Sequence, residues 1–345
     1  MHEILKLQQK IVPELMELLE KRYDILRTIK YNQPIGRRIL ANKIGIGERV
    51  VRTEISFLKK QNLINISNPG MSVTKDGEEI IDKLKNFIKE FKGLTEIEEI
   101  IKEKLNIKKV IIVPGDIDED STVMNEIGRT AAKFIQSIIL DGDIVAISGG
   151  TTMKSLVDNY SYSPRYQNTV VVPARGGMER NLQTEANTLA ANFADKLGAS
   201  YKLIHVPDNL SNEALSTIIN EKSIKNAIDT IRKADIIIYG VGRADEMSSK
   251  RGLSDEEISH ILGNGSVAEA FGYYFDKEGN VVYHTPSLGL KTEDIRKAKN
   301  IVAVAGSKSK AEAIVATQIS GSKRSVLITD EGTSKEIMRI LKVTN

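Results

Sequence analysis

At 345 residues, the chain is long enough for about two domains, each with its own core. It contains no cysteine, which excludes disulfides and thiolate ligands, and its four scattered histidines (2, 205, 260 and 284) predict no metal site. No apolar run is long enough to cross a membrane, and the N-terminus lacks the apolar core of a signal peptide. We therefore expect a cytoplasmic protein.

The net charge of +3 conceals an uneven distribution along the chain. Between Lys21 and Lys75, twelve lysines and arginines accompany three acids, so this segment carries +9 and the rest of the chain −6. Such a concentration of positive charge is typical of nucleic-acid binding, although a solvated lysine-rich surface has the same composition.

The N-terminal segment, residues 1–31, predicts two helices. A leucine-rich apolar stripe covers residues 1–21, where Pro13 predicts a kink, and this piece is a candidate dimerising arm. The second helix covers 22–31 and stops before Pro34.

A winged helix-turn-helix follows. Helices at 35–44 and 48–61 flank the turn Gly45-Ile46-Gly47, and two helices joined by a short glycine-containing turn form a helix-turn-helix. The next elements complete a domain that ends near residue 92: strands at 63–67 and 71–74 around a turn, then a helix at 75–92.

The helix at 48–61 has the composition of a DNA recognition helix. Val51, Ile55 and Leu58 recur at helical spacing and are expected to face the core. Arginine, serine and threonine suit base edges, and lysine and arginine suit phosphates. A protein-docking winged helix remains the alternative. The candidate DNA-binding residues are Arg37, Arg38, Arg49, Arg52, Thr53, Ser56, Lys59 and Lys60.

Residues 93–345 alternate apolar strands with helices, which predicts an α/β domain with a doubly wound, mostly parallel sheet. The expected strands are 108–114, 143–147, 169–173, 201–206, 235–239, 301–305 and 325–328. The expected helices are 95–105, 125–140, 153–159, 184–197, 212–233, 255–262, 309–319 and 334–341.

Four glycine-containing loops follow the carboxyl ends of these strands, where open α/β sheets bind ligands. In Gly149-Gly150-Thr151-Thr152, the glycines allow a close backbone approach and the following helix start attracts an anion. The loops at 174–177, 240–245 and 306–310 each contain a cation, Arg175 and Lys310 among them. Several such loops on one rim predict a phosphorylated small molecule with two anionic ends, whereas one loop alone fits a purely structural turn.

Four further residues are candidates for this site. The carboxylates of Glu269 and Glu185 suit sugar hydroxyls, although an acid in a first helical turn, as Glu185 is, needs no ligand to explain it. Lys250 and Arg251 lie between two predicted helices, where they either reach the pocket or face water.

The winged helix is followed in order by five motifs: Gly149-Gly150-Thr151-Thr152, Pro173-Ala174-Arg175-Gly176-Gly177, Gly240-Val241-Gly242-Arg243-Ala244-Asp245, Glu269-Ala270-Phe271-Gly272-Tyr273-Tyr274-Phe275-Asp276 and Gly306-Ser307-Lys308-Ser309-Lys310. Together they resemble the SorC-type family of bacterial sugar-responsive transcription regulators, over essentially the whole chain. The resemblance implies a homo-oligomeric repressor of glycolytic genes that loses operator DNA when fructose-1,6-bisphosphate or a related sugar phosphate binds. It implies effector contacts from Gly149, Gly150, Thr151, Thr152, Arg175, Glu269 and Lys310, and from Glu185, Lys250 and Arg251.

An enzyme is the main alternative, because the same domain is similar to ribose-5-phosphate isomerase and glucosamine-6-phosphate deaminase. In that interpretation Asp245 or Glu246 is a general base, and otherwise both are loop acids. Enzymes of this type need no DNA-binding domain, so we predict a sensor with no catalytic residue and no cofactor.

Overall fold

A computed structural model describes residues 11–177, 181–206 and 212–343. The chain divides into two compact units. The first runs to Glu96 and includes Glu119–Thr122, and the second comprises Ile97–Asp118 and the chain from Val123 onward. Residues 1–10 of the predicted N-terminal arm lie outside the described residues.

The first unit begins with one long helix, α2 (Pro13–Asn32). We predicted two helices that meet near residue 21, and this was wrong, because α2 is continuous there. Pro13 occupies the first turn of α2, where its missing N–H costs nothing, and Val12 before it is not helical. The kink predicted at Pro13 stays a prediction, because most of the chain before it lies outside the described residues. The buried side chains of Met16, Tyr23 and Leu26 then continue one apolar stripe across the expected break.

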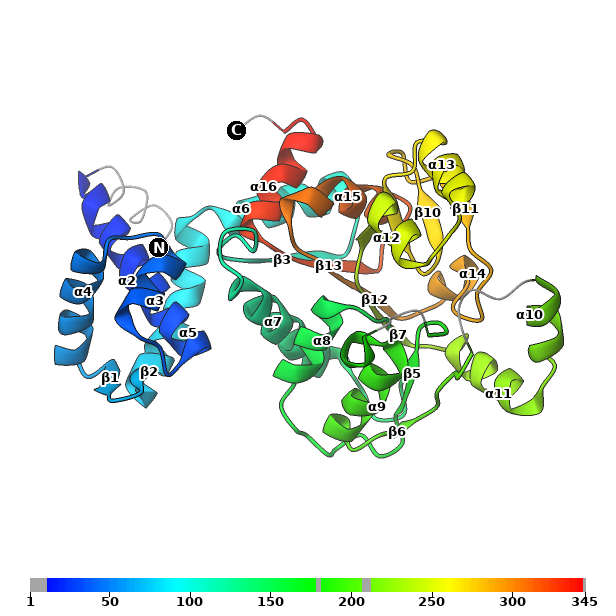
Figure 1. Ribbon diagram of the computed structural model, residues 1–345, viewed down its shortest axis with the longest axis horizontal. Helices are drawn as coiled ribbons and strands as arrows, with labels where there is room; N and C mark the ends of the chain where they lie inside the picture. The colour runs from blue at the N-terminus through cyan, green and yellow to red at the C-terminus, as the bar shows by residue number, and fades with distance from the viewer. Residues whose placement is uncertain (1–10, 178–180, 207–211, 344–345) are drawn as a thin grey trace. The chain divides into compact units, whose positions relative to one another are not determined.

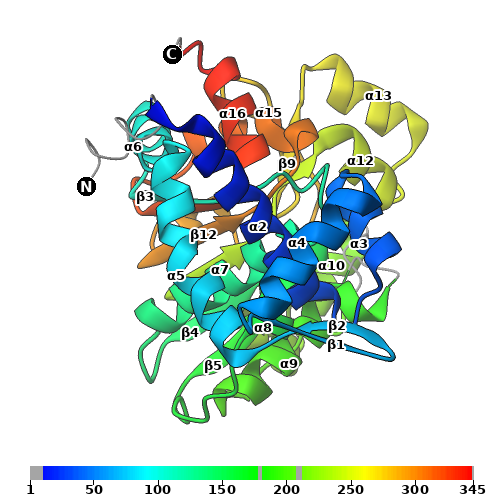
Figure 2. The same cartoon turned by 90° about the vertical axis from the view of Figure 1, so that its left-hand side faces the viewer.

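The helix-turn-helix and the wing confirm the prediction. The turn between α3 (Arg37–Ile44) and α4 (Glu48–Lys60) begins at Gly45, whose φ of +66° is left-handed. A hairpin and a helix follow, and Figure 2 shows the hairpin after α4 within this unit. Their bounds are β1 (Ile64–Ser67), β2 (Gly70–Val73) and α5 (Lys75–Phe91). The core of the unit includes Tyr23, Leu26, Leu40, Val51, Ile55, Leu58, Ile64, Met71 and Ile81.

The second unit is built on a parallel seven-stranded sheet, ordered β3-β13-β12-β7-β4-β5-β6 (Figure 1). Its strands are β3 (Lys109–Val113), β4 (Ile144–Ile147), β5 (Val170–Pro173), β6 (Ser200–Tyr201), β7 (Ile236–Tyr239), β12 (Asn300–Val304) and β13 (Ser325–Asp330). Its helices are α6 (Leu94–Leu105), which starts in the first unit, α7 (Val123–Ile138), α8 (Thr151–Asn159), α9 (Ala186–Leu197), α10 (Asn212–Ile218), α11 (Lys222–Ile231), α12 (Ala244–Lys250), α13 (Asp255–Gly263), α14 (Thr292–Ile295), α15 (Ala311–Ile319) and α16 (Glu331–Ile340), with short 3₁₀ turns η1 (Leu182–Thr184) and η2 (Lys308–Lys310).

Both faces of this sheet are covered. Ile236, Ile238 and Val302 belong to a core cluster shared with α7, α8 and α9. Their alternating neighbours, such as Ile237 and Ala303, are equally buried and point to the opposite face. Strands that are buried on both faces have continuous apolar sequences, and for this reason the sequence predicted this sheet.

The prediction missed a second sheet. It is antiparallel, ordered β11-β10-β9-β8, and has very short strands. They are β8 (Gly242–Arg243), β9 (Ala268–Ala270), β10 (Tyr273–Phe275) and β11 (Val281–His284). The expected strand 201–206 was also wrong, because only Ser200 and Tyr201 pair with β5.

Within the part of the chain that the structure describes, no helix is long and apolar enough to cross a membrane. The same residues contain no group of three or more histidines and acids able to hold a metal ion.

Candidate functional sites: an anion pocket and a DNA-binding surface

The turn between β4 and α8 presents a helix start to the cavity. Gly150 is the N-cap of α8 with φ +114°, a conformation that favours glycine, and no side chain caps the helix. The carbonyl oxygen of Thr184 accepts the Gly150 N–H at 2.8 Å and so holds the turn in place. The helix begins at Thr151, two residues before the predicted start, so Thr151 and Thr152 lie in its first turn. The backbone N–H groups of that turn are free to bind an anion.

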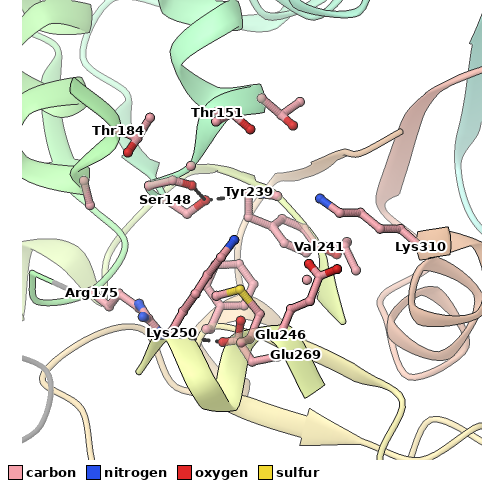
Figure 3. A pocket seen from close by; sticks show the side chains of 18 of the residues that line it. Ser148, Thr151, Arg175, Thr184, Tyr239, Val241, Glu246, Lys250, Glu269 and Lys310 are labelled. Carbon is pink, nitrogen blue, oxygen red and sulfur yellow. Dashed lines mark hydrogen bonds and ion pairs between the residues drawn. The ribbon is translucent and has the colours of Figure 1, made fainter. Parts of the chain in front are cut away.

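The predicted loops meet around one cavity, which has a volume of about 150 Å3 and is partly open to solvent (Figure 3). Eight predicted residues line it: Gly149, Gly150, Thr151, Thr152, Arg175, Lys250, Glu269 and Lys310. Glu246, the candidate general base of the enzyme alternative, also lines it, and further lining residues that we did not predict as ligand contacts include Ser148, Gly176, Thr184, Tyr239, Val241, Met247 and Phe271. Loops separated by 160 residues therefore meet at one site, as the switch-point rule predicts.

Two predicted residues, Glu185 and Arg251, do not line this cavity. The Glu185 side chain accepts a hydrogen bond from the Thr188 N–H at 2.9 Å and caps α9. This fits the alternative that an acid at the start of this helix needs no ligand to explain it. Arg251 is buried and donates to Glu269 at 2.5 Å and to Thr285 at 3.2 Å. It supports the site from behind, without facing water or the ligand space.

Glu269 is the centre of a buried charge cluster. Its Oε1 accepts hydrogen bonds from Arg251 and from the Gly272 N–H at 2.6 Å, and lies 3.5 Å from Nη1 of Arg175. Both arginines and the glutamate have side chains less than one-tenth exposed. Arg175 and Glu269 also line the cavity, so this cluster brings a guanidinium group to the ligand space.

Two lysines face the same space from opposite sides: Figure 3 shows the amino groups of Lys250 and Lys310 pointing into it. Burial lowers the pKa of Lys310, and the nearby charge of Lys250 lowers it further, whereas Glu246 opposes both effects. A phosphate would relieve this penalty because it returns a negative charge to the ammonium group.

The two acids of the predicted catalytic loop differ in position. Asp245 pairs with Arg243, its Oδ1 3.1 Å from Nε, and does not line the cavity. Glu246 lines the cavity and faces Lys310. Of the two candidate general bases, only Glu246 is thus within reach of a bound sugar.

Sequence signals for the missed residues were weak. Ser148 adjoins the glycine pair, and its hydroxyl accepts the Gly240 N–H at 3.2 Å, which ties two rim loops together. Phe271 has φ +56°, unusual for an aromatic residue, and its ring packs 4.6 Å from that of Tyr239 between centroids. Nothing in the sequence around Tyr239 or Thr184 distinguishes them from ordinary strand or turn residues.

The candidate DNA-binding surface is open to solvent. Val51, Ile55 and Leu58 of α4 are buried as predicted, whereas all eight candidate DNA-binding residues are exposed. The Thr53 and Ser56 hydroxyls donate to the carbonyls of Arg49 and Arg52, one turn earlier in the helix. The exposed residues are Arg37, Arg38, Arg49, Arg52, Thr53, Ser56, Lys59 and Lys60.

Three cations counted in the basic segment serve the fold. Arg22 lies over the ring of Phe57 at 3.7 Å and pairs with Glu54 at 2.8 Å. Arg27 is buried and pairs with Asp120 at 2.7 Å, and Lys30 lies 3.4 Å from Asp82. The charge available to DNA is therefore concentrated on α3 and α4.

Two family descriptions together match most of the chain. Residues 89–339 match the family described as "Putative sugar-binding domain", and residues 18–88 match the CggR N-terminal DNA binding domain. The chain is 40% identical to the Central glycolytic genes regulator of Bacillus subtilis over 98% of this chain and 99% of that protein. The regulator of the same name from Priestia megaterium is 39% identical over the same shares. The chain belongs to the family of central glycolytic genes regulators.

Solved structures place this family among the SorC-type regulators. A SorC-family transcriptional regulator from Enterococcus faecalis is 34% identical, with a TM-score of 0.66 over 70% of this chain and 99% of that one. The full-length sorbitol operon regulator SorC from Klebsiella pneumoniae shares the fold, with a TM-score of 0.66 and 19% identity over 90% of this chain and 96% of that one. The resemblance inferred from the motifs is confirmed, and this central glycolytic genes regulator homologue is a DNA-binding transcription regulator with a sugar-binding domain.

Proposed function

We propose that the chain represses glycolytic genes and that fructose-1,6-bisphosphate, bound in the cavity beside α8, weakens its hold on operator DNA. The observation that carries this proposal is the pairing of two anion-binding features across one cavity. The uncapped start of α8 lies at one side, and Arg175, Lys250 and Lys310 contribute cations from the others. A sugar with two phosphates would use both, whereas a monophosphate would use one.

The cavity volume of about 150 Å3 is small for a sugar bisphosphate, although the cavity is partly open to solvent. The long, flexible side chains of Lys250 and Met247 line it, so their displacement would admit the ligand. We expect the Lys250 and Met247 side chains to reorient on binding and to contact a bisphosphate more extensively than a monophosphate.

The regulatory step is linkage. The effector binds one arrangement of a dimer or tetramer more tightly, and that arrangement spaces the paired winged helices poorly for the operator. The protein acts in the cytoplasm without catalysis. A coupled assay for sugar-phosphate isomerisation or deamination should give no rate above background, and a rate abolished by Glu246→Gln would favour the enzyme alternative.

Thermal unfolding with and without ligand is the direct test. A ligand that binds only the native state raises its stability by mass action. We expect fructose-1,6-bisphosphate to raise the melting temperature more than fructose-6-phosphate or inorganic phosphate at equal concentration. Equal shifts from all three would overturn the two-anion pocket, and no shift would overturn the effector.

Operator titration completes the test. A duplex selected from random sequence by this protein serves as the operator, and its affinity is measured with and without saturating bisphosphate. Unchanged affinity would contradict the repressor mechanism even if the ligand binds. The variant Thr152→Val is expected to keep operator binding and lose the response, with Thr130→Val on the outer part of α7 as its matched control.

A further inference from the structure

A second cavity lies in the C-terminal unit, on the face of the large sheet opposite to α7, α8 and α9. Tyr239 and Ile301 alternate with Ile238 and Val302, which belong to the core on the α7 side. The cavity is bounded by this sheet, the small sheet, α14 and the end of α15, all labelled or traceable in Figure 1. Its volume is about 310 Å3, against about 150 Å3 for the effector pocket, and both are open to solvent on one side.

Small side chains line much of this space. Ala270, Gly279, Ser320, Gly321 and Ser322 leave a hollow that opens to solvent, where Asn280, Arg296 and Gly321 are exposed. A dry cavity of about 150 Å3 is enough to bind benzene. A volume about twice as large accommodates a molecule the size of two fused rings.

The lining has a different chemistry from the effector pocket. Phe271, Phe275 and Tyr239 supply aromatic surface, and Asn280 with several hydroxyl groups supplies polar contacts. Arg296 is its single cation, and no carboxylate lines the cavity in the described part of the chain. An apolar body with one negative group matches this lining, whereas a bisphosphate leaves one charge unpaired.

The two cavities share a wall, because Tyr239 and Phe271 line both of them. The Tyr239 hydroxyl accepts a hydrogen bond from Nε2 of Gln318 at 3.0 Å, and Oε1 of Gln318 accepts one from Ser325 at 2.6 Å. Ser325 itself lines the second cavity. A molecule bound there would therefore contact both the ring pair and the hydrogen-bonded chain that holds Tyr239.

We propose that this cavity is a second small-molecule site, for a monoanion with a flat apolar body of about two rings, and that it is coupled to the effector pocket through Tyr239 and Phe271. The anion meets Arg296 and the rings of the ligand pack against the three aromatic residues. Because coupling between sites is reciprocal, each ligand changes the affinity for the other by the same factor.

Fluorescence titration with 2-naphthoate tests the binding step. The chain has no tryptophan, so naphthalene emission can be read without interference from the protein. We expect saturable one-to-one binding, at least ten-fold weaker for the neutral 2-naphthamide and for the variant Arg296→Gln. The variant Ala270→Leu fills the cavity and should abolish binding, and its melting curve verifies that it folds.

Two controls separate this site from its surroundings. Lys323→Gln changes an exposed neighbouring cation that does not line the cavity and should bind 2-naphthoate normally. Lys310→Met should also bind it normally, because only the effector pocket is altered. Binding lost in Lys310→Met, equal binding of the amide, or normal binding by Arg296→Gln would each overturn the proposal. A doubled mass on sedimentation with the probe would overturn it in favour of a protein interface.

The coupling is measured by repeating the titration with saturating fructose-1,6-bisphosphate. We expect the affinity for 2-naphthoate to change at least three-fold, and an unchanged affinity overturns the coupling. Should the bisphosphate fail to bind, inorganic phosphate takes its place. The first titration contains no sugar phosphate, so failure of the proposed effector and failure of this site give different results.

Discussion

The two functional regions are built in opposite ways. On α3 and α4, all eight candidate DNA-binding side chains are exposed, and removing any of them uncovers no core. In the effector pocket, Arg175 and Glu269 are buried, and Glu269 pairs with both Arg175 and the buried Arg251. The side chains of the DNA surface therefore contribute little to the stability of the fold, whereas those of the pocket are part of its buried interior. Changes to the first should affect binding alone, and changes to the second should affect stability and binding together.

The strongest test of this contrast is Glu269→Ala. It leaves two buried guanidinium groups without their shared carboxylate, and breaking a buried ion pair costs about 3–5 kcal/mol. Urea unfolding followed by circular dichroism measures the loss. Glu246→Ala is the matched control, because its half-exposed carboxylate lines the same cavity, and it should cost under about 1 kcal/mol. Equal losses in the two variants would show that the cluster is not structural.

On the DNA surface the expected effect is in binding. Arg52→Ala should weaken operator binding by about 1–3 kcal/mol and leave the free energy of unfolding within about 0.5 kcal/mol of the parent. Fluorescence anisotropy at several salt concentrations measures both affinity and salt slope. Lys83→Ala on α5 is the control, because this exposed cation already pairs with Glu79 at 2.6 Å. A folding defect in Arg52→Ala would contradict the separation of DNA surface and core.

Sequence reasoning succeeded where one short segment contains its own signal. The spacing of Val51, Ile55 and Leu58 predicted which face of α4 is buried, and the opposite face followed from it. The parallel strands were equally readable from their apolar runs. The exception is the break expected near residue 21, because the apolar stripe of α2 continues through it.

Sequence reasoning failed where a residue acts through partners that are distant in the chain. Arg251 looked like a loop cation, and only its contacts with Glu269 and Thr285 reveal a buried support. Glu185 lies near the rim yet caps α9, an alternative that its position in the first turn had already suggested. The small antiparallel sheet escaped prediction because strands of two to four residues carry no measurable period.

Gly150→Ala separates backbone strain from ligand contact. An alanine at φ +114° costs about 1–3 kcal/mol, although nothing lies within 4 Å of the added carbon. Gly142→Ala is a matched control with φ +94°, equally open surroundings and no place in the cavity lining. We expect similar thermal destabilisation from both, and loss of stabilisation by fructose-1,6-bisphosphate only from Gly150→Ala. A retained ligand shift in that variant would remove the α8 turn from the proposed site.

The smallest expected effect is on pH dependence and comes from Lys310. Since burial lowers the pKa of its ammonium group below the ordinary 10.5, an alkaline solution deprotonates it within the native state. A bound phosphate favours the charged form, so effector affinity should be constant below the lowered pKa and fall as pH rises through it. Near pH 6 affinity should also fall with decreasing pH, because phosphate then gains its second proton, whose pKa is about 6.

Calorimetric titration between about pH 7 and pH 10 measures the alkaline fall, and Lys310→Met should remove it while weakening binding throughout. Three other groups near Lys310 must be distinguished. Glu246 and Asp118 are the acids whose charges act on Lys310, and both are unchanged in Lys310→Met. Lys250 also faces the cavity, so Lys250→Met is the matched control. In that variant the fall of effector affinity at alkaline pH should persist. A fall that survives in Lys310→Met and disappears in Lys250→Met would assign the phosphate contact to the other lysine.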